Sequence, residues 1–253
     1  MYKLRDWIPK EKLTWRLCSN PNAIEMLEEN QVMINWQDLS TNPSAMHLLT
    51  PDKVHWSYLS CNPSAIRILE QNLDKVDWEG LSSNPEAIHI LEANPERINW
   101  HILSTNPAAI HLLIKNPDKI NWSYLSSNPA AIHILEANPH IIDWNWLSKN
   151  PAAMHLLHAN TEKINWTLLS ENPNALHLLE ENMNEIDWHR LSENPGAIDL
   201  LEQFPHKIKW SWFSSNPSIF VYDYERMAYK KSLLHAELFA VCYHPENIKL
   251  LVI

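Results

Sequence analysis

The dipeptide Asn-Pro returns at a nearly constant interval along most of this chain of 253 residues, and this repeat limits the possible folds more than any other feature. Ten of its copies form a series in which neighbours are 22 residues apart, with a single interval of 20 residues. Internal repeats of roughly 20 to 50 residues are typical of solenoids and related arrays, in which every unit is one supersecondary motif. The Asn residues of the ten copies are Asn20, Asn42, Asn62, Asn84, Asn106, Asn128, Asn150, Asn172, Asn194 and Asn216. A tryptophan accompanies each copy: Trp15, Trp36, Trp56, Trp78, Trp100, Trp122, Trp144, Trp166, Trp188 and Trp210.

Each unit predicts two short helices. Asn is a strong N-cap residue and Pro is tolerated at the first helical position, so a pair such as Asn84-Pro85 begins the first helix. A second Asn-Pro, such as Asn94-Pro95, ends that helix, and an Asn or Asp directly before the tryptophan caps the second helix. Helices this short are marginal in isolation, so they must be stabilised by stacking on neighbouring units. We therefore expect an all-α fold, a right-handed α-solenoid of about ten two-helix repeats of 22 residues.

The repeat pattern covers residues 15–217, and the flanking segments are expected to cover the ends of the solenoid. Residues 1–14 contain several apolar side chains and are expected to form an N-terminal cap. Residues 218–253 lack the repeat pattern, and their apolar residues recur at helical spacing, so we expect a C-terminal helical cap. The whole chain is thus expected to form one continuous domain.

Helical periodicity divides each unit into core and surface positions. In the first helix Ala, Ile and the second Leu share one face, as at Ala109, Ile110 and Leu113. In the second helix Trp and Leu share a face, as at Trp122 and Leu125. We expect both faces to be buried, because a tryptophan in every repeat supplies a large apolar area to a small unit.

The composition argues against an enzyme. The chain has only two glycines, whereas phosphate-binding loops need several at fixed spacing. No paired-cysteine or His-Glu-x-x-His sequence offers a metal site, and three cysteines without a pairing pattern indicate free thiols and a cytoplasmic location. The net charge of −10 counts against nucleic acid as a partner, and no stretch is apolar enough to cross a membrane. We expect a non-enzymatic protein with no catalytic residues, no cofactor and no metal.

The position two residues after each tryptophan, which we name the slot, varies from unit to unit and is rich in apolar and aromatic residues. A variable, aromatic-rich surface on a regular scaffold is typical of repeat proteins that bind a partner. The alternative is that the slot packs inward against the following repeat. The candidate partner-binding residues are Tyr58, Ile102, Tyr124, Trp146, Leu168, Arg190 and Trp212.

A second recurrent position carries histidine in most units and lies nearly opposite the apolar face of the first helix. One interpretation is an exposed cationic or pH-responsive stripe, favoured by a Glu three residues later, as at Glu92 after His89. The alternative is a structural role, in which each imidazole hydrogen-bonds to a carbonyl or to the next repeat; recurrence in unit after unit favours this interpretation. The residues of the stripe are His47, Arg67, His89, His111, His133, His155 and His177.

Three segments carry a resemblance to a known kind of protein: residues 6–9 (Asp-Trp-Ile-Pro), units such as residues 81–89 (Leu-Ser-Ser-Asn-Pro-Glu-Ala-Ile-His), and residues 222–224 (Tyr-Asp-Tyr). Over roughly residues 4–245 the chain resembles the short Asn-Pro/Trp helical repeats of paralogous families encoded by giant nucleocytoplasmic DNA viruses. It is similar, more loosely, to leucine-rich-variant α-solenoids. The resemblance implies a viral scaffold protein in the host cytoplasm or virus factory, and it implies no biochemical activity.

These observations predict a repeat scaffold that binds a host or viral protein. A self-assembling structural or virion component is the first alternative, because repeats with weakly polar ends could stack end to end. Recognition of nucleic acid through the variable positions is a further alternative, which the acidic charge disfavours.

Overall fold

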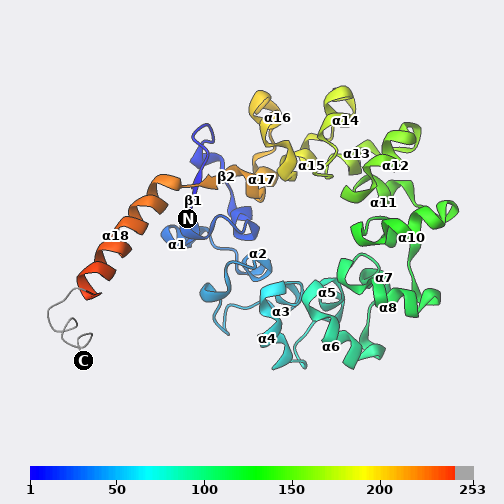
Figure 1. Ribbon diagram of the computed structural model, residues 1–253, viewed down its shortest axis with the longest axis horizontal. Helices are drawn as coiled ribbons and strands as arrows, with labels where there is room; N and C mark the ends of the chain where they lie inside the picture. The colour runs from blue at the N-terminus through cyan, green and yellow to red at the C-terminus, as the bar shows by residue number, and fades with distance from the viewer. Residues whose placement is uncertain (243–253) are drawn as a thin grey trace.

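The computed structural model describes residues 1–242, and the repeats in it bend into a closed ring (Figure 1). Helices that begin at tryptophan form the inner layer of the ring, and helices that follow Asn-Pro form the outer layer (Figure 1). The inner helices are α2 (Trp36–Thr41), α3 (Trp56–Ser60), α5 (Trp78–Ser83), α7 (Trp100–Leu103), α9 (Trp122–Ser126), α11 (Trp144–Ser148), α13 (Trp166–Leu169), α15 (Trp188–Glu193) and α17 (Trp210–Phe213). The outer helices are α1 (Ile24–Glu29), α4 (Ile66–Glu70), α6 (Ile88–Ala93), α8 (Ile110–Lys115), α10 (Ile132–Ala137), α12 (Met154–Ala159), α14 (Leu176–Glu181) and α16 (Ile198–Gln203). The predicted all-α tandem-repeat architecture is confirmed.

Two repeats use a 3-10 helix in place of an α-helix. In the first repeat the inner layer is formed by the 3-10 helix Trp15–Ser19. In the unit that is two residues shorter, the outer layer is the 3-10 helix Met46–Leu48. The spacing between successive tryptophans is 21 residues in the first of these units and 20 in the second, against 22 elsewhere, so the shortened sequence is accommodated by tighter helical turns.

The helix boundaries follow the predicted capping chemistry. The side-chain oxygen of Asn84 accepts a hydrogen bond from the Glu86 N–H at 3.0 Å, and a 3-10 turn then leads into α6. Asn94 ends α6, where its side-chain amide donates to the Ile90 carbonyl at 2.8 Å. No residue in the described part of the chain has a positive φ, which explains why the fold needs so few glycines.

The Asn of each Asn-Pro pair also joins its repeat to the preceding one, a role that the capping rule alone did not predict. The side chain of Asn106 is buried, and its amide donates to the carbonyls of Ser82 and Asn84, both at 3.1 Å. A second ladder lies beside the first, in which the Asn99 N–H donates to the Ser82 hydroxyl at 3.0 Å. Buried polar groups are costly unless they are hydrogen-bonded, so the two ladders hold neighbouring repeats in a fixed register.

The same two ladders join the last repeat to the first. The Asn20 side-chain amide donates to the carbonyls of Ser214 at 3.2 Å and Asn216 at 2.8 Å. The Thr14 N–H donates to the Ser214 hydroxyl at 3.0 Å, as the N-cap residues of the inner helices from α3 to α17 donate to a serine of the preceding repeat. At α2 the acceptor is the Cys18 sulfur, 3.2 Å from the Asn35 nitrogen. The contacts between repeats therefore continue around the whole molecule, and the solenoid expected to be an open rod has no free end.

Residues 1–14, expected to cap an open end, lie in the seam of the ring. Strand β1 (Tyr2–Leu4) pairs antiparallel with strand β2 (Phe220–Tyr222), which follows the last repeat. The ring of Trp7 packs against Phe213 with the ring centres 5.8 Å apart. Pairing of these two strands thus ties together the beginning and the end of the repeat region.

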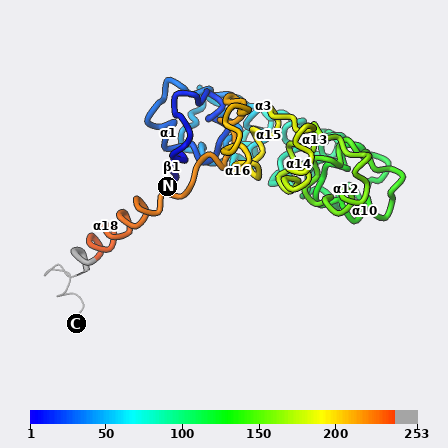
Figure 2. The backbone as a smooth tube through the Cα atoms, turned by 90° about the horizontal axis from the view of Figure 1, so that it is seen from above, coloured from blue at the N-terminus to red at the C-terminus, as the bar shows by residue number. Residues whose placement is uncertain are grey.

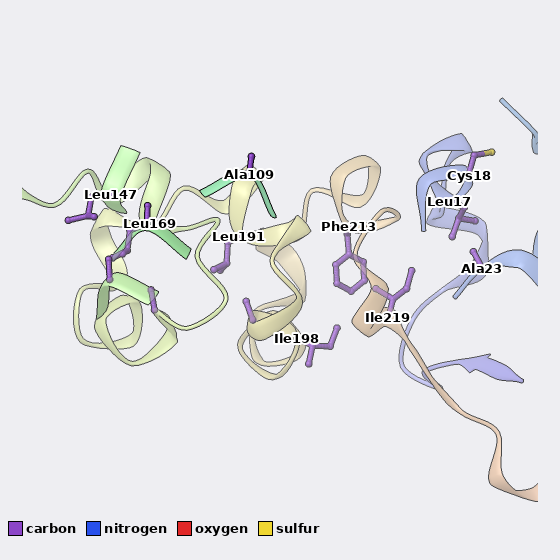
Figure 3. Close-up of a cluster of buried hydrophobic side chains, with 14 of the residues drawn as sticks. Leu17, Cys18, Ala23, Ala109, Leu147, Leu169, Leu191, Ile198, Phe213 and Ile219 are labelled. Carbon is purple, nitrogen blue, oxygen red and sulfur yellow. The ribbon is translucent and has the colours of Figure 1, made fainter. Parts of the chain in front are cut away.

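The core lies between the two helical layers. Ala109, Leu113 and Leu125 are fully buried, as predicted, whereas Ile110 and Trp122 are half-buried at the edges of the core. Figure 3 shows how the row of buried side chains crosses the seam, through Leu147, Leu169, Leu191, Phe213 and Leu17. The apolar core is thus continuous across the junction of the first and last repeats.

Helix α18 (Tyr224–Cys242) leaves the ring as an arm (Figure 2). Its side chains from Tyr224 to Leu238 are exposed, so this helix does not cover the repeats in the way expected of a cap spanning residues 218–253. The reason is the closed ring, which leaves no exposed end for such a cap to cover. Residues 243–253 of the expected cap lie outside the described residues.

Candidate partner-binding surface on the inner wall

The slot residues lie on the side of the inner helices that faces the centre of the ring. In α11, for example, Leu147 and Ser148 are fully buried toward the outer layer. The slot residue Trp146 points about 150° away from the mean direction of those two side chains. Because the inner helices line the concave side (Figure 1), the slot belongs to the inner wall of the ring. The sequence alone did not indicate which face is concave.

The exposure of the slot residues varies around the ring. Tyr58 and Trp212 have 39% and 37% of their surface exposed. The remaining candidates are half-buried: Ile102, Tyr124, Trp146, Leu168 and Arg190. Both interpretations of the slot thus apply in part, because these side chains pack along the wall and also present surface to the centre of the ring.

Tyr124, Trp146 and Lys149 form an aromatic cluster on neighbouring inner helices. The rings of Tyr124 on α9 and Trp146 on α11 meet edge to face, with centres 4.9 Å apart. The Lys149 ammonium lies over the Trp146 ring, 4.7 Å from its centre. Burial lowers the pKa of Lys149, and the nearby positive charge of Arg190 lowers it further. A partly desolvated cation beside two aromatic rings in edge-to-face contact is a common composition of a protein-binding hot spot.

Arg190 extends this surface toward α15. Its guanidinium forms an ion pair with Glu171, just beyond the end of α13, and lies 3.8 Å from Asp187 of its own repeat. The arginine head is therefore held in place by two carboxylates while its side chain stays partly exposed. The inner wall from α9 to α15 thus combines aromatic, aliphatic and charged groups on consecutive repeats.

A second aromatic site on the inner wall lies at the seam of the ring. The Arg16 guanidinium lies 4.0 Å from the centre of the Trp212 ring and 5.7 Å from that of Trp15. It also forms an ion pair with Glu193 at 3.1 Å. The sequence identified Trp212 but not Trp15 or Arg16 as surface candidates, because only ring closure brings the first repeat beside the last.

The histidine stripe lies on the outer wall and connects adjacent repeats. His89 Nε2 is 2.7 Å from Glu70, and His111 Nε2 is 3.1 Å from Glu92, in each case on the preceding repeat. His47 and His155 make the same contact, with Glu28 and Glu136. The partner of His89 is therefore not Glu92, three residues later, but the Glu of the neighbouring helix. A contact from each imidazole to the neighbouring repeat agrees with the structural interpretation of the stripe. The same imidazoles are also about half exposed.

Three members of the stripe, His133, Arg67 and His177, lack such a neighbour. The position that would face His133 is Ile114, of which 58% is exposed, and Arg67 is exposed on α4. His177 instead lies 3.4 Å from Glu181, one turn later in its own helix. The stripe is thus a set of separate contacts between repeats, not one continuous charged surface.

A rim of cations over tryptophan rings was not predicted from the sequence. Each basic residue lies over the tryptophan of the preceding repeat; Lys119, for example, is 4.5 Å from the centre of the Trp100 ring. Lys12 makes this contact with Trp210 across the seam at 4.7 Å. A cavity of about 870 Å³ opens on this rim, lined by Trp78, Arg97, Trp100, His101 and Lys119 among others. Half-buried tryptophans are thereby shielded by alkyl chains and ammonium groups in place of further core residues.

Within residues 1–242, no three His, Cys, Asp or Glu side chains converge on a position for a metal ion. No helix in the same part of the chain combines the length and apolar character required to span a membrane. Comparison of the chain with protein-family models, with curated proteins and with solved structures gave no match.

Proposed function

We propose that this ring is a non-enzymatic scaffold that binds a protein segment on its inner wall. The observation that carries the proposal is the cluster of Tyr124, Trp146 and Lys149, which continues through Leu168 to Arg190. Tyrosine, tryptophan and arginine are the residue types most enriched at interface hot spots.

Within each repeat, the positions that form the recurring buried contacts are separate from the slot, and this separation supports the proposal. The Asn, Ser, Leu and Ala of each unit serve buried contacts that recur around the ring. The slot is not required for the two hydrogen-bond ladders, and its side chain changes from repeat to repeat. A position free of structural constraint on a repeating scaffold can evolve toward a particular partner.

The dimensions of the ring restrict the partner to a narrow segment. Ten inner helices packed about 8 to 10 Å apart give a circle of helix axes about 25 to 32 Å across. Subtracting one helix diameter of about 10 Å leaves an opening of about 15 to 22 Å, wide enough for one α-helix or an extended segment. The polar residue directly after most of the repeat tryptophans, such as Glu79 and His101, is exposed, so these side chains are accessible to a partner.

The finer parts of the proposal rest on the resemblance described above. If the chain is a viral protein of the cytoplasm or virus factory, its partner is a host or viral protein with an exposed helical or extended segment. A structural role in self-assembly is the second candidate, and the exposed arm α18 is the observation that favours it.

Affinity capture with quantitative mass spectrometry tests the proposal. The native ring is compared with a Tyr124→Ser/Trp146→Ser double variant, and Ile114→Ser on the outer wall serves as the matched control. Small polar replacements are preferable to glutamate because both aromatic rings are half-buried. A partner held by the native ring and by the control, but lost from a folded double variant, supports the inner wall as the binding surface. Equal capture by all three proteins would rule this surface out.

A further inference from the structure

Helix α18 has the length and the exposed surface of a helix that lacks its partner. It runs over 19 residues, and the side chains from Tyr224 to Leu238 are exposed. Its first turn is held by the ring, where Arg226 donates to Glu25 of α1 at 2.5 Å. A helix of this length is marginal in water unless an apolar face packs against another element.

Four exposed apolar residues of α18, with Lys231 between them, follow the spacing of a coiled-coil seam. Tyr224, Met227, Lys231, Leu234 and Leu238 are separated by three, four, three and four residues, which is the a/d pattern of a heptad repeat. Tyr224, Leu234 and Leu238 expose 72%, 59% and 55% of their surface. Such a seam fits another helix that carries the same spacing, because each side chain inserts between four residues of the facing helix.

We propose that α18 is a dimerisation arm that pairs antiparallel with α18 of a second copy of this chain. The other α-helices within residues 1–242 have four to six residues, too few for a complete heptad, so α18 is the one described helix that can supply a matching seam. This proposal is independent of the proposed function, because it uses neither the inner wall nor its partner.

The charges beside the seam decide the orientation of the pair. In a parallel pair the two copies of Lys231 would meet in the same layer and repel each other. In an antiparallel pair Lys231 lies beside Leu234 of the second copy, and Met227 lies beside its Leu238. The flanking Lys230 of each copy then faces Glu237 of the other, which gives two complementary charge pairs related by the twofold axis.

The arrangement of the arm leaves room for this pairing. Figure 2 shows α18 pointing away from the ring, so an antiparallel pair places the two rings at opposite ends of the helices. Arg226, not Lys230, forms the ion pair with α1, and Lys230 only lines the shallow pocket beside Glu25 and Glu29. The seam residues lie on a different side of the helix from Arg226, so the ring and a second arm can be held at the same time.

Sedimentation of the full-length chain over a concentration series tests the seam. The native chain should change from one to two copies as its concentration rises, and Leu234→Glu/Leu238→Glu should remain a single copy throughout. Leu233→Glu is the matched control, since Leu233 is 45% exposed on the same helix but lies outside the seam. A native chain that stays monomeric, or a seam variant that still dimerises, overturns the proposal.

A charge exchange tests the orientation in the same assay. Lys230→Glu alone and Glu237→Lys alone each place like charges opposite one another in the antiparallel pair, and each should weaken dimerisation several-fold. The double variant Lys230→Glu/Glu237→Lys restores both pairs and should recover the native dissociation constant. Failure of the double variant to recover it overturns the antiparallel arrangement. Capture of a partner by the inner wall is measured separately, so the two proposals can fail independently.

Discussion

Substitution of Asn20 by alanine tests whether the ring is closed in solution. In the closed ring this side chain makes three hydrogen bonds: its amide donates to two carbonyls of the last repeat, and its oxygen accepts from the Asn22 N–H at 3.0 Å. Removing it leaves buried polar groups without partners, each at a cost of roughly 1 to 3 kcal/mol. We therefore expect Asn20→Ala to lower the free energy of unfolding by about 3 kcal/mol or more.

The comparison with an internal position makes the prediction specific. Asn106 makes the equivalent three bonds in the middle of the chain, so Asn106→Ala should cost about as much as Asn20→Ala. In an open solenoid, Asn20 would lie at a free end and act only as a helix cap, and its replacement would cost about 1 kcal/mol. Asn138 provides a calibration, because its amide makes one bond, to the Ile134 carbonyl at 2.9 Å, and its loss should cost about 1 kcal/mol.

Urea unfolding followed by far-ultraviolet circular dichroism gives the three free energies from the midpoints and slopes. Equal large losses for Asn20→Ala and Asn106→Ala, both well above that for Asn138→Ala, are the result expected of a closed ring. A loss for Asn20→Ala no larger than that for Asn138→Ala, with a large loss for Asn106→Ala, would refute closure through this ladder.

Three further predictions follow from single side chains. A Cβ at Gly196 would lie 2.3 Å from the Pro173 carbonyl oxygen, so Gly196→Ala should lower the free energy of unfolding in urea by about 1 to 3 kcal/mol. Burial disfavours the charged form of Asp38 in the folded state and so raises its pKa. The Asp38→Asn variant should therefore have a higher melting temperature than the native protein at pH 7. The difference in melting temperature should vanish as the pH falls below the ordinary aspartate pKa. Burial also raises the pKa of the Cys18 and Cys61 thiols. Iodoacetamide should therefore modify Cys61, whose residue is exposed, slowly at neutral pH and faster as the pH is raised. Buried Cys18 should react only on unfolding, and mass spectrometry of the alkylated chain measures both rates.

Local structure was the part of the fold that the sequence predicted best. Asn84-Pro85 and Asn94-Pro95 mark helix boundaries through bonds within two to four residues, which a propensity argument can anticipate. The inter-repeat role of the same Asn side chains was missed, because it depends on carbonyls 22 and 24 residues away, such as those that Asn106 reaches. The side chain of a fully buried Asn can donate hydrogen bonds through its amide and accept one through its oxygen. The presence of Asn at this position in all ten units was the sequence signal for a contact that recurs between repeats.

Ring closure could not be read from any one repeat. It is the sum of a small turn at each interface, and the side chains that seal it include Thr14 and the short strand Tyr2–Leu4, neither of which matches the repeat consensus. The sequence left open whether the slot is exposed or packs inward, and in the structure the exposure of each slot residue depends on the next repeat. Tyr58 is more exposed than Tyr124 because its neighbour in the following slot is Gly80, whereas Tyr124 packs against Trp146.

Closure connects the number of repeats to the kind of partner that the ring can hold. Ten repeats complete a circle when each turns the chain by about 36°. The inner helices contact their neighbours closely while the outer helices spread apart, so each repeat has the shape of a wedge. One more repeat would add about 8 to 10 Å to the inner circumference and hence about 3 Å to the diameter. Because the first repeat must match the last for the Asn and Ser ladders to meet, the width of the opening can change only by whole repeats. The slot residues then determine which segment binds within an opening whose width the repeat number has already set.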